Sequence, residues 1–372
     1  MNHLLLRGGY HAKSGPQSTP PHQHMSAFSS SSSSSLITEA TERTKEYLGL
    51  IDKRRSETLG ESQIDEEVIP YLSRHVGKVR DVYICENFVV MVTTDRQSAF
   101  DRNLASIPYK GSVLNLTSQW WFKQTESFVP NHLIGCPHPN VTIAKKCTVF
   151  PVEFVMRSYM TGTTSTSIWK NYNSGVRMYC GHHLPEGMVK NQKLPEILLT
   201  PTTKDEHDEL ISAEQIIASG RMSAEDWQVC ADYAYELFVF SQKKTSEKGL
   251  ILVDTKYEFG KDTDGKIVLI DEIQTPDSSR YWVGDTYEDR MAKGEEPDNI
   301  DKEFLRKWFV SQCDPYTAEV LPEAPTELIN ELSRRYIMIY EILTGEKLLL
   351  DTATESNLTD CLRKYLKEQE LL

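Results

Sequence analysis

Apolar runs separated by turn residues predict an antiparallel β-hairpin near the start of the globular part of the chain. Residues 77–85 and 88–94 form its two strands, which are joined across two polar residues. Because side chains alternate along a strand, Lys78 and Arg80 are expected on one face of the first strand. The second strand, FVVMVTT, is apolar on both faces, so we expect it at the centre of its sheet.

Apolar side chains with helical spacing predict three amphipathic helices. Residues 112–128 contain a pair of tryptophans that we expect in the core. Residues 224–247 place their apolar side chains on one stripe, with Ser223 as the expected N-cap and Gly249 just beyond the end. Residues 325–345 show the same kind of stripe, which indicates a structural helix.

A second hairpin is predicted at residues 250–272, where two apolar strands flank a turn with the letters DG. Asp254, Lys256 and Glu258 occupy alternate positions of the first strand and therefore share a face. A further strand is expected at residues 148–157, either bent by its internal proline or placed at an edge. Strands that occur in hairpins, without regular alternation with helices, favour an α+β fold over a doubly wound sheet.

The first 38 residues differ from the rest of the chain because they contain no Asp or Glu and include a run of serines at residues 29–35. Leaders of this composition are typical of organelle transit peptides, and the low arginine content favours a plastid. One alternative is a disordered tail without an address. The alternative locations are the cytoplasm and the mitochondrion. We therefore treat residues 1–45 as a leader and residues 351–372 as a polar C-terminal tail.

Composition and charge exclude several classes of protein. Hydrophobic residues make up 39% of the chain, but no run reaches the roughly 20 apolar residues of a membrane span. Lys and Arg number 41 against 54 Asp and Glu, a net charge of -13, so nucleic acid is not an expected partner. Seven scattered cysteines without CxxC spacing argue against a disulfide framework or a thiolate zinc site. The sequence leaves a homo-oligomer open.

The second hairpin carries the residues that predict chemistry. Its carboxylates, together with Asp271 and Glu272 at the end of the returning strand, would be costly to bury without a counter-ion. A magnesium ion that also binds substrate phosphate would satisfy them. The loop at residues 275–280 adds hydroxyl groups and an arginine, which suit a phosphate or carboxylate anion. The alternative is a solvent-facing strand edge with ordinary ion pairs.

Two common nucleotide-binding motifs are absent from the sequence. There is no GxxxxGK[ST] for a P-loop, and no GxGxxG opens a helix after a strand. The first hairpin is the best remaining phosphate cover, since Gly77 permits close approach and Lys78 supplies charge. The loop at residues 94–101, which includes Ser98, follows a buried strand and is a second candidate.

Several ordered motifs occur between roughly residues 70 and 316, and they are GKVRDVY, SAFD, FPVEFVMR with its following Thr-Gly, TPTTK to His207–Asp208, LVDTKYEFG and DEIQTPDSSRYW. In these motifs the chain resembles the SAICAR synthetase family. The segment at residues 176–199 looks most like plant members. The resemblance implies a fold related to ATP-grasp enzymes, with ATP in a cleft between two antiparallel-sheet domains, at residues 46–155 and 156–350.

The resemblance also implies a reaction and its substrates. ATP, L-aspartate and a carboxyaminoimidazole ribonucleotide would give the succinocarboxamide nucleotide, ADP and phosphate. An acyl phosphate would first convert the unreactive carboxylate into an electrophile, which the aspartate amine then attacks. The protein would contribute mainly positioning and charge stabilisation.

Roles carry over from the family at matching positions. The resemblance implies catalytic roles for Lys256, Glu258 and Asp271. It implies magnesium binding by Asp208, Glu258 and Asp271. The implied ATP-binding residues are Gly77, Lys78, Arg80, Glu153, Met156 and Lys204. The implied contacts to the imidazole nucleotide are Ser98, Arg157, Thr163, Lys256, Asp277, Ser279 and Arg280. Thr163 replaces the serine of the family pattern and keeps the hydroxyl group.

Two rival functions follow from the same residues. A small-molecule kinase could use a similar ATP cleft, and it would release ADP without aspartate. A nucleotide-binding regulator without catalysis is the other reading, but such a protein has no need of Lys256, Glu258 and Asp271. The aspartate pocket and the role of residues 164–191 do not follow from the sequence.

Overall fold

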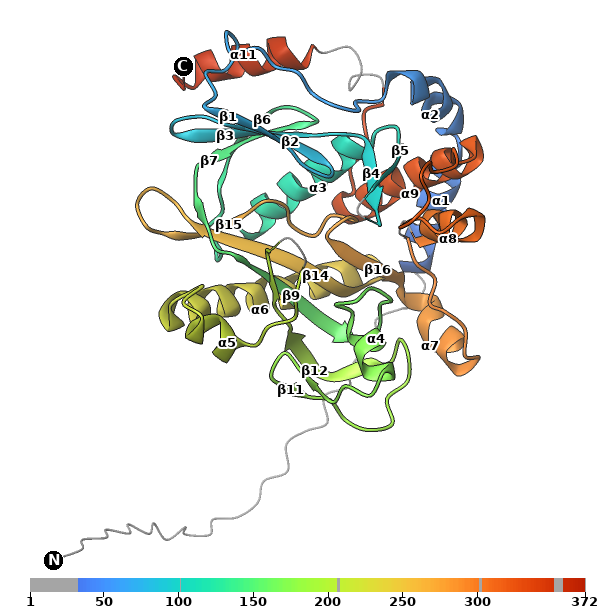
Figure 1. The fold of residues 1–372 in the computed structure, drawn as a ribbon. Coiled ribbons are helices and arrows are strands. Elements are labelled where there is room, and N and C mark those ends of the chain that lie inside the picture. The colour runs from blue at the N-terminus through green and yellow to red at the C-terminus, as the bar shows by residue number, and fades with distance from the viewer. Residues whose placement is uncertain (1–32, 101, 206–207, 301–302, 351–356, 372) are drawn as a thin grey trace, which may run out of the picture.

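The computed structural model describes residues 33–100, 102–205, 208–300, 303–350 and 357–371, which form two large antiparallel sheets and two two-stranded ones, with helices packed around them (Figure 1). The strands are β1 (Ser73–Val76), β2 (Arg80–Ile84), β3 (Phe88–Thr93), β4 (Arg96–Ala99), β5 (Arg102–Ser106), β6 (Leu133–His138), β7 (Val141–Lys145), β8 (Thr148–Val149), β9 (Val152–Tyr159), β10 (Met178–Tyr179), β11 (His182–His183), β12 (Lys193–Leu199), β13 (Thr202–Thr203), β14 (Leu250–Lys261), β15 (Ile267–Ile270) and β16 (Ser279–Val283). The helices are α1 (Ser33–Lys45), α2 (Leu48–Arg54), η1 (Arg55–Glu57), α3 (Lys110–Thr125), α4 (Ile168–Asn173), α5 (Ala213–Ala218), α6 (Ala224–Ser246), α7 (Gly284–Ala292), α8 (Glu303–Gln312), α9 (Thr326–Thr344) and α11 (Leu358–Glu368).

The first sheet has five strands in the order β1-β2-β3-β7-β6. β3 lies at its centre, which confirms the interpretation of its two-sided apolar pattern. The strand predicted from residue 77 is wrong at its start, because residues 77–79 form the turn between β1 and β2. The Gly77 amide donates to the Arg80 carbonyl at 2.7 Å and closes this turn. Lys78 therefore lies in the turn and Arg80 begins β2, so the two do not share a strand face.

The second sheet is built around β14, which pairs with β9, β16, β15 and β8. The predicted hairpin is confirmed as β14 and β15. The strand predicted at residues 148–157 divides at Phe150 and Pro151 into β8 and β9, because proline has no N–H to continue the ladder. Since β9 lies between β12 and β14, the bend was the right alternative and the edge was wrong. A domain boundary after residue 155 would cut through β9.

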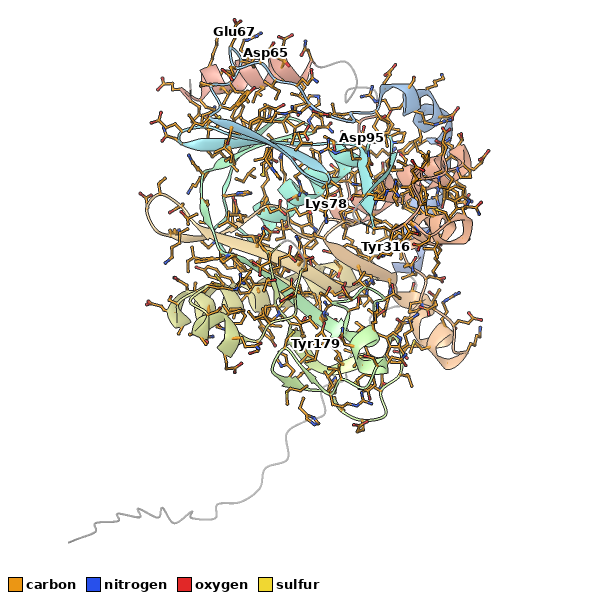
Figure 2. The ribbon with its side chains drawn as sticks, viewed as in Figure 1. Asp65, Glu67, Lys78, Asp95, Tyr179 and Tyr316 are labelled. Atoms are coloured by element: carbon orange, nitrogen blue, oxygen red, sulfur yellow. The ribbon has the colours of Figure 1, made fainter. Side chains whose placement is uncertain are left out.

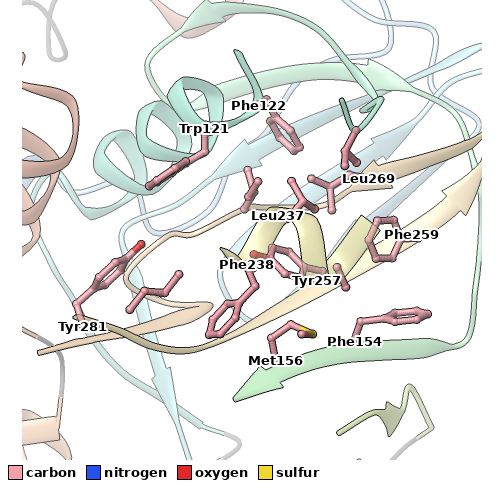
Figure 3. Packing of buried hydrophobic residues seen from close by; sticks show 14 of the residues in the cluster. Trp121, Phe122, Phe154, Met156, Leu237, Phe238, Tyr257, Phe259, Leu269 and Tyr281 are labelled. Atoms are coloured by element: carbon pink, nitrogen blue, oxygen red, sulfur yellow. The ribbon is translucent and has the colours of Figure 1, made fainter. Parts of the chain in front are cut away.

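The largest hydrophobic cluster lies between the second sheet, α6 and α3 (Figure 3). The stripe predicted on α6 is confirmed, since Trp227, Cys230, Ala234, Leu237 and Phe238 are all buried. The Ser223 side chain caps α6 by accepting from the Asp226 amide at 3.0 Å. Of the tryptophan pair expected in the core, Trp121 is fully buried and Trp120 is partly buried against the same cluster. The predicted helix at residues 325–345 is confirmed as α9.

The boundaries predicted for the leader and for the C-terminal tail both need correction. The leader was drawn to residue 45, but α1 packs on α9, with Ala40 buried and Arg43 paired with Glu341 at 2.8 Å. Only residues 1–32 of the expected leader lie outside the described residues. The polar tail contains α11, whose Leu362 and Leu366 are fully buried against the first sheet. Leu362 and Leu366 are four residues apart and therefore share one face of the helix, although the surrounding sequence is mostly polar.

Across the described part of the chain, every helix is too short or too polar to span a membrane.

Candidate active site

The two sheets meet where the β1–β2 turn approaches the end of β15. Figure 2 shows Lys78 in this position, between the upper and lower sheets. Arg80, the first residue of β2, contacts Asp271 at 2.9 Å and Glu272 at 2.6 Å, just after β15. Burial alone would lower the pKa of the Arg80 guanidinium, but Glu272 and Asp271 outweigh burial and raise it. Arg80 thus joins the predicted phosphate cover to the predicted metal-binding carboxylate.

A cluster of lysines and carboxylates lies on one face of β14 and β9. Lys256 donates to Glu153 at 2.8 Å and to Glu258 at 2.9 Å. Lys204 also pairs with Glu258. Burial by itself would raise the pKa of Glu258, but Lys256 and Lys204 lower it to about 2. Because β14 alternates its side chains, Lys256 and Glu258 share a face as predicted.

Asp271 occupies an unusual backbone position directly after β15. Its φ is 64°, in the left-handed region that aspartate tolerates better than most side chains. Burial raises the pKa of its carboxyl, although Arg80 opposes this change. Strained backbone of this kind often occurs at functional sites. Its side chain is 25% exposed, so a ligand can reach it.

The predicted magnesium set is only partly supported. Glu258 and Asp271 are neighbours, since Glu258 of β14 pairs with Ile270 of β15, and the Glu258 carboxylate adds to the effect of burial in raising the pKa of Asp271. Asp208 is exposed, and within the described ranges no group of three His, Cys, Asp or Glu side chains could hold a metal ion. The role of Asp208 in magnesium binding stays a prediction. Two hard carboxylates do fit magnesium, which prefers one or two of them together with substrate phosphate.

A cavity of about 200 Å³ adjoins this cluster. Its described lining residues are Val155, Arg157, Thr164, Ser167, Asp254, Thr255, Lys256, Pro276, Asp277, Ser278, Ser279, Arg280 and Arg306. Asp254 lies between two arginines, 3.4 Å from Arg157 and 3.1 Å from Arg280. Arg157 is also held by Thr200 at 2.9 Å. Several cations in a small cavity suit an anionic ligand.

The other predicted residues are placed differently. Thr163 lines a neighbouring cavity that shares Arg280 with the first. Ser98 donates its hydroxyl to the Arg102 carbonyl at 3.2 Å, and the described lining of neither cavity includes it. The Met156 side chain packs in the hydrophobic cluster (Figure 3), so the predicted contact of Met156 with ATP would have to be made by its backbone. The reason is alternation on β9, which turns Met156 away from the face that carries Glu153.

Sequence reasoning missed several residues of the site. Asp254 was recognised as part of the charged face, but its position between two arginines depends on the pairing of β14 with β9 and β16. Thr164 and Ser167 also line the cavity, but their segment of the sequence carries no pattern that predicts this position. Lys110 and Tyr336, on α3 and α9, both contact Asp277. The apolar stripe at residues 325–345 predicts burial for Tyr336 but no polar contact, and Lys110 precedes the helix predicted at residues 112–128.

Taken together, the second sheet and its loops bring cations and carboxylates to one cavity, beside the place where Arg80 of the first sheet contacts Asp271 and Glu272. This arrangement suits an enzyme that handles anionic small molecules. A family model described as SAICAR synthetase matches residues 73–323. The phosphoribosylaminoimidazole-succinocarboxamide synthase of Legionella pneumophila (strain Lens) is 58% identical over 290 residues, 78% of this chain and 93% of that protein. The chloroplastic synthase of Arabidopsis thaliana is 54% identical over 307 residues, 82% of this chain and 75% of that protein.

Solved structures agree with the sequence comparisons. The SAICAR synthase of Saccharomyces cerevisiae, solved with SAICAR, is 32% identical, with a TM-score of 0.67 over 78% of this chain and 100% of that one. A SAICAR synthetase in complex with ADP is 25% identical, with a TM-score of 0.57 over 74% of this chain and 99% of that one. The chain belongs to the SAICAR synthetase family. The predicted family and α+β fold are therefore confirmed, whereas a relation to ATP-grasp enzymes stays a prediction.

Proposed function

We propose that this chain is an ATP-dependent ligase of purine biosynthesis. It joins L-aspartate to the carboxylate of carboxyaminoimidazole ribonucleotide and releases ADP and phosphate. The observation that carries this proposal is the convergence of Arg157, Arg280 and Lys256 on one cavity beside Glu258 and Asp271. Relatives named as synthases of the succinocarboxamide support the same reaction.

The reaction has two steps because a carboxylate is a poor electrophile. A carboxylate oxygen of the nucleotide first attacks the γ-phosphorus of ATP, and the bond to ADP breaks. The aspartate amine then attacks the acyl carbon, loses a proton, and displaces phosphate. Each step needs the reacting groups to be held close and developing negative charge to be stabilised, which a positioned set of cations provides.

The residues of the site suit these needs. Lys256 lies between Glu153 and Glu258 and lines the cavity, so its charge can stabilise the nucleotide carboxylate as it reacts. Arg157 and Arg280, aligned by Asp254, would hold anionic groups of the nucleotide. Lys78 and Arg80, in and beside the β1–β2 turn, would cover the ATP phosphates, together with Lys204. The solved relative with ADP supports an ATP site in this fold.

Magnesium would be held by Glu258 and Asp271 together with phosphate oxygens of ATP. When bound, it would neutralise phosphate charge during phosphoryl transfer. Arg80 and the two lysines balance the same carboxylates in the chain alone. Asp208 lies in the exposed segment after residues 206–207 and would need to approach to take part.

An isotope experiment tests the acyl phosphate. The nucleotide is labelled with ¹⁸O in its carboxylate and converted with ATP, aspartate and magnesium. One labelled oxygen should appear in the released phosphate, because the carboxylate oxygen that attacks ATP leaves with phosphorus. Phosphate without label would contradict the mechanism. A kinase would leave the phosphoryl group on its acceptor and release no phosphate.

We also propose that the chain acts in plastids. Its acid-free first 38 residues and the chloroplastic names of its Arabidopsis thaliana and Vigna aconitifolia relatives support this location. Since α1 belongs to the fold, the address should lie within residues 1–32. Those residues fused to a fluorescent reporter should reach plastids in plant cells, and a diffuse cytosolic signal would refute the location. The reporter alone is the control.

A further inference from the structure

A buried lysine outside the cavity contacts one of its walls. Lys110 is the first residue of α3 and has 0% of its surface exposed. Its ammonium donates to the Asp277 carboxylate at 2.7 Å and to the Arg96 carbonyl at 2.9 Å. A buried cation is costly unless it is paired and hydrogen-bonded, so Asp277 is the counter-ion that allows Lys110 to be charged here.

A buried tyrosine contacts the other oxygen of the same carboxylate. Tyr336 lies on α9, is 2% exposed, and donates its hydroxyl to Asp277 Oδ1 at 2.5 Å. Gln97 Oε1 lies 3.2 Å from the same hydroxyl. Because a hydroxyl carries one proton, the shorter contact to Asp277 takes it. The Lys110 ammonium lies 5.8 Å from the centre of the Tyr336 ring, which adds a favourable cation–π contact.

Asp277 faces the cavity from the loop between β15 and β16. Its backbone amide donates to the Thr275 hydroxyl at 3.3 Å, which itself donates to Glu272 at 2.5 Å. Asp277 lines the cavity together with Ser279 and Arg280. Each carboxylate oxygen has two acceptor sites, and Lys110 and Tyr336 use one on each oxygen. Since Asp277 also lines the cavity, its orientation there is set by these two contacts.

We propose that Lys110 and Tyr336 are positioning residues for Asp277. They come from two helices, α3 and α9, and not from the strands that carry the proposed substrate-binding residues. Together they fix both oxygens of the Asp277 carboxylate, in the wall of the cavity. The ionised, correctly oriented Asp277 then accepts hydrogen bonds from donor groups of the nucleotide substrate. This inference rests on the proposed function, which assigns the cavity to that nucleotide. A purely structural ion pair would instead affect stability and leave the affinity for one substrate unchanged.

The test compares two tyrosines on the same helix. Tyr336→Phe removes the hydroxyl that contacts Asp277 and keeps the buried ring. Tyr340→Phe, one turn further along α9, removes a hydroxyl that lies 3.3 Å from Glu346, away from the cavity. Tyr336→Phe should raise KM for the carboxylated nucleotide about tenfold, ~1.4 kcal/mol, and leave KM for ATP within about twofold. Tyr340→Phe should leave both KM values within about twofold of the unmodified enzyme.

A double-mutant cycle shows whether Tyr336 acts through Asp277. Asp277→Asn alone should raise the same KM, and adding Tyr336→Phe to it should bring little further increase. Equal changes in the KM values for ATP and nucleotide, or independent additive effects of the two substitutions, would overturn the proposal. An unmodified enzyme without ligase activity would defeat the proposed function itself. An active enzyme whose nucleotide KM is unchanged by Tyr336→Phe would defeat only the positioning role.

Discussion

At the scale of single residues, Asp271 shows how the site balances competing demands. Its backbone is held at a φ of 64°, its carboxyl loses hydration through burial, and Arg80 supplies a compensating charge at 2.9 Å. A left-handed residue other than glycine costs about 1 to 2 kcal/mol, which the surrounding structure must offset. Such a residue is easier to understand as part of a binding site than as a device for stability.

Replacing Asp271 with Asn tests this interpretation. The substitution keeps size and polarity but removes the negative charge that would bind magnesium. We expect kcat to fall by about 100-fold or more, by analogy with the loss of one electrostatic contact at an active site. The fold, followed by circular dichroism, should be kept. Asp264→Asn in the exposed β14–β15 turn is the matched control and should be fully active. Normal magnesium-dependent turnover of Asp271→Asn would refute the metal role.

How far individual site residues could be predicted depended on the kind of pattern they belong to. Alternation along β14 was enough to place Lys256 and Glu258 on one face. Family motifs supplied Arg157, Asp277 and Arg280, which the structure gathers at one cavity. Lys110 could not be found, because a lysine at the start of a helix is usually exposed, and only the tertiary fold buries it beside Asp277.

At the scale of elements, local pattern predicted the long elements well and the short or hidden ones poorly. α6 and α9 have clear apolar stripes, and β14 is long and apolar. The turn at residues 77–79 was missed, because a glycine inside an apolar run does not by itself reveal where a strand breaks. The helix α11 was missed because only two of its side chains, Leu362 and Leu366, reach the core as fully buried residues.

The contribution of α11 to stability can be measured directly. Leu366→Ala removes a side chain with 0% exposure from the cluster that α11 forms with the first sheet. We expect the free energy of unfolding, measured by urea denaturation, to fall by about 2 to 5 kcal/mol. Leu349, which is 69% exposed, provides the control, and Leu349→Ala should stay within about 0.5 kcal/mol of the original protein. Equal effects of the two substitutions would show that α11 does not pack on the sheet in solution.

At the scale of the whole molecule, the site exists because two sheets bring different chemistry together. The first sheet supplies the β1–β2 turn with Lys78 and Arg80, and the second supplies Lys256, Glu258 and Asp271. Arg80 is one of the contacts that join them, through Asp271 and Glu272. Neither the pairing order of the sheets nor this contact follows from local sequence, because both join segments that are far apart in the chain, 191 positions in the case of Arg80 and Asp271. Family resemblance predicted the arrangement, and the solved relatives agree with its fold.

The central claim is that ATP cleavage is coupled to amide formation. Purified protein with magnesium and ATP should release ADP rapidly only when aspartate and carboxyaminoimidazole ribonucleotide are both present. The acyl phosphate needs the nucleotide to form and aspartate to turn over, so omitting either substrate should reduce steady-state ADP release to background. ADP release at the same rate without aspartate would contradict the ligase and support a kinase.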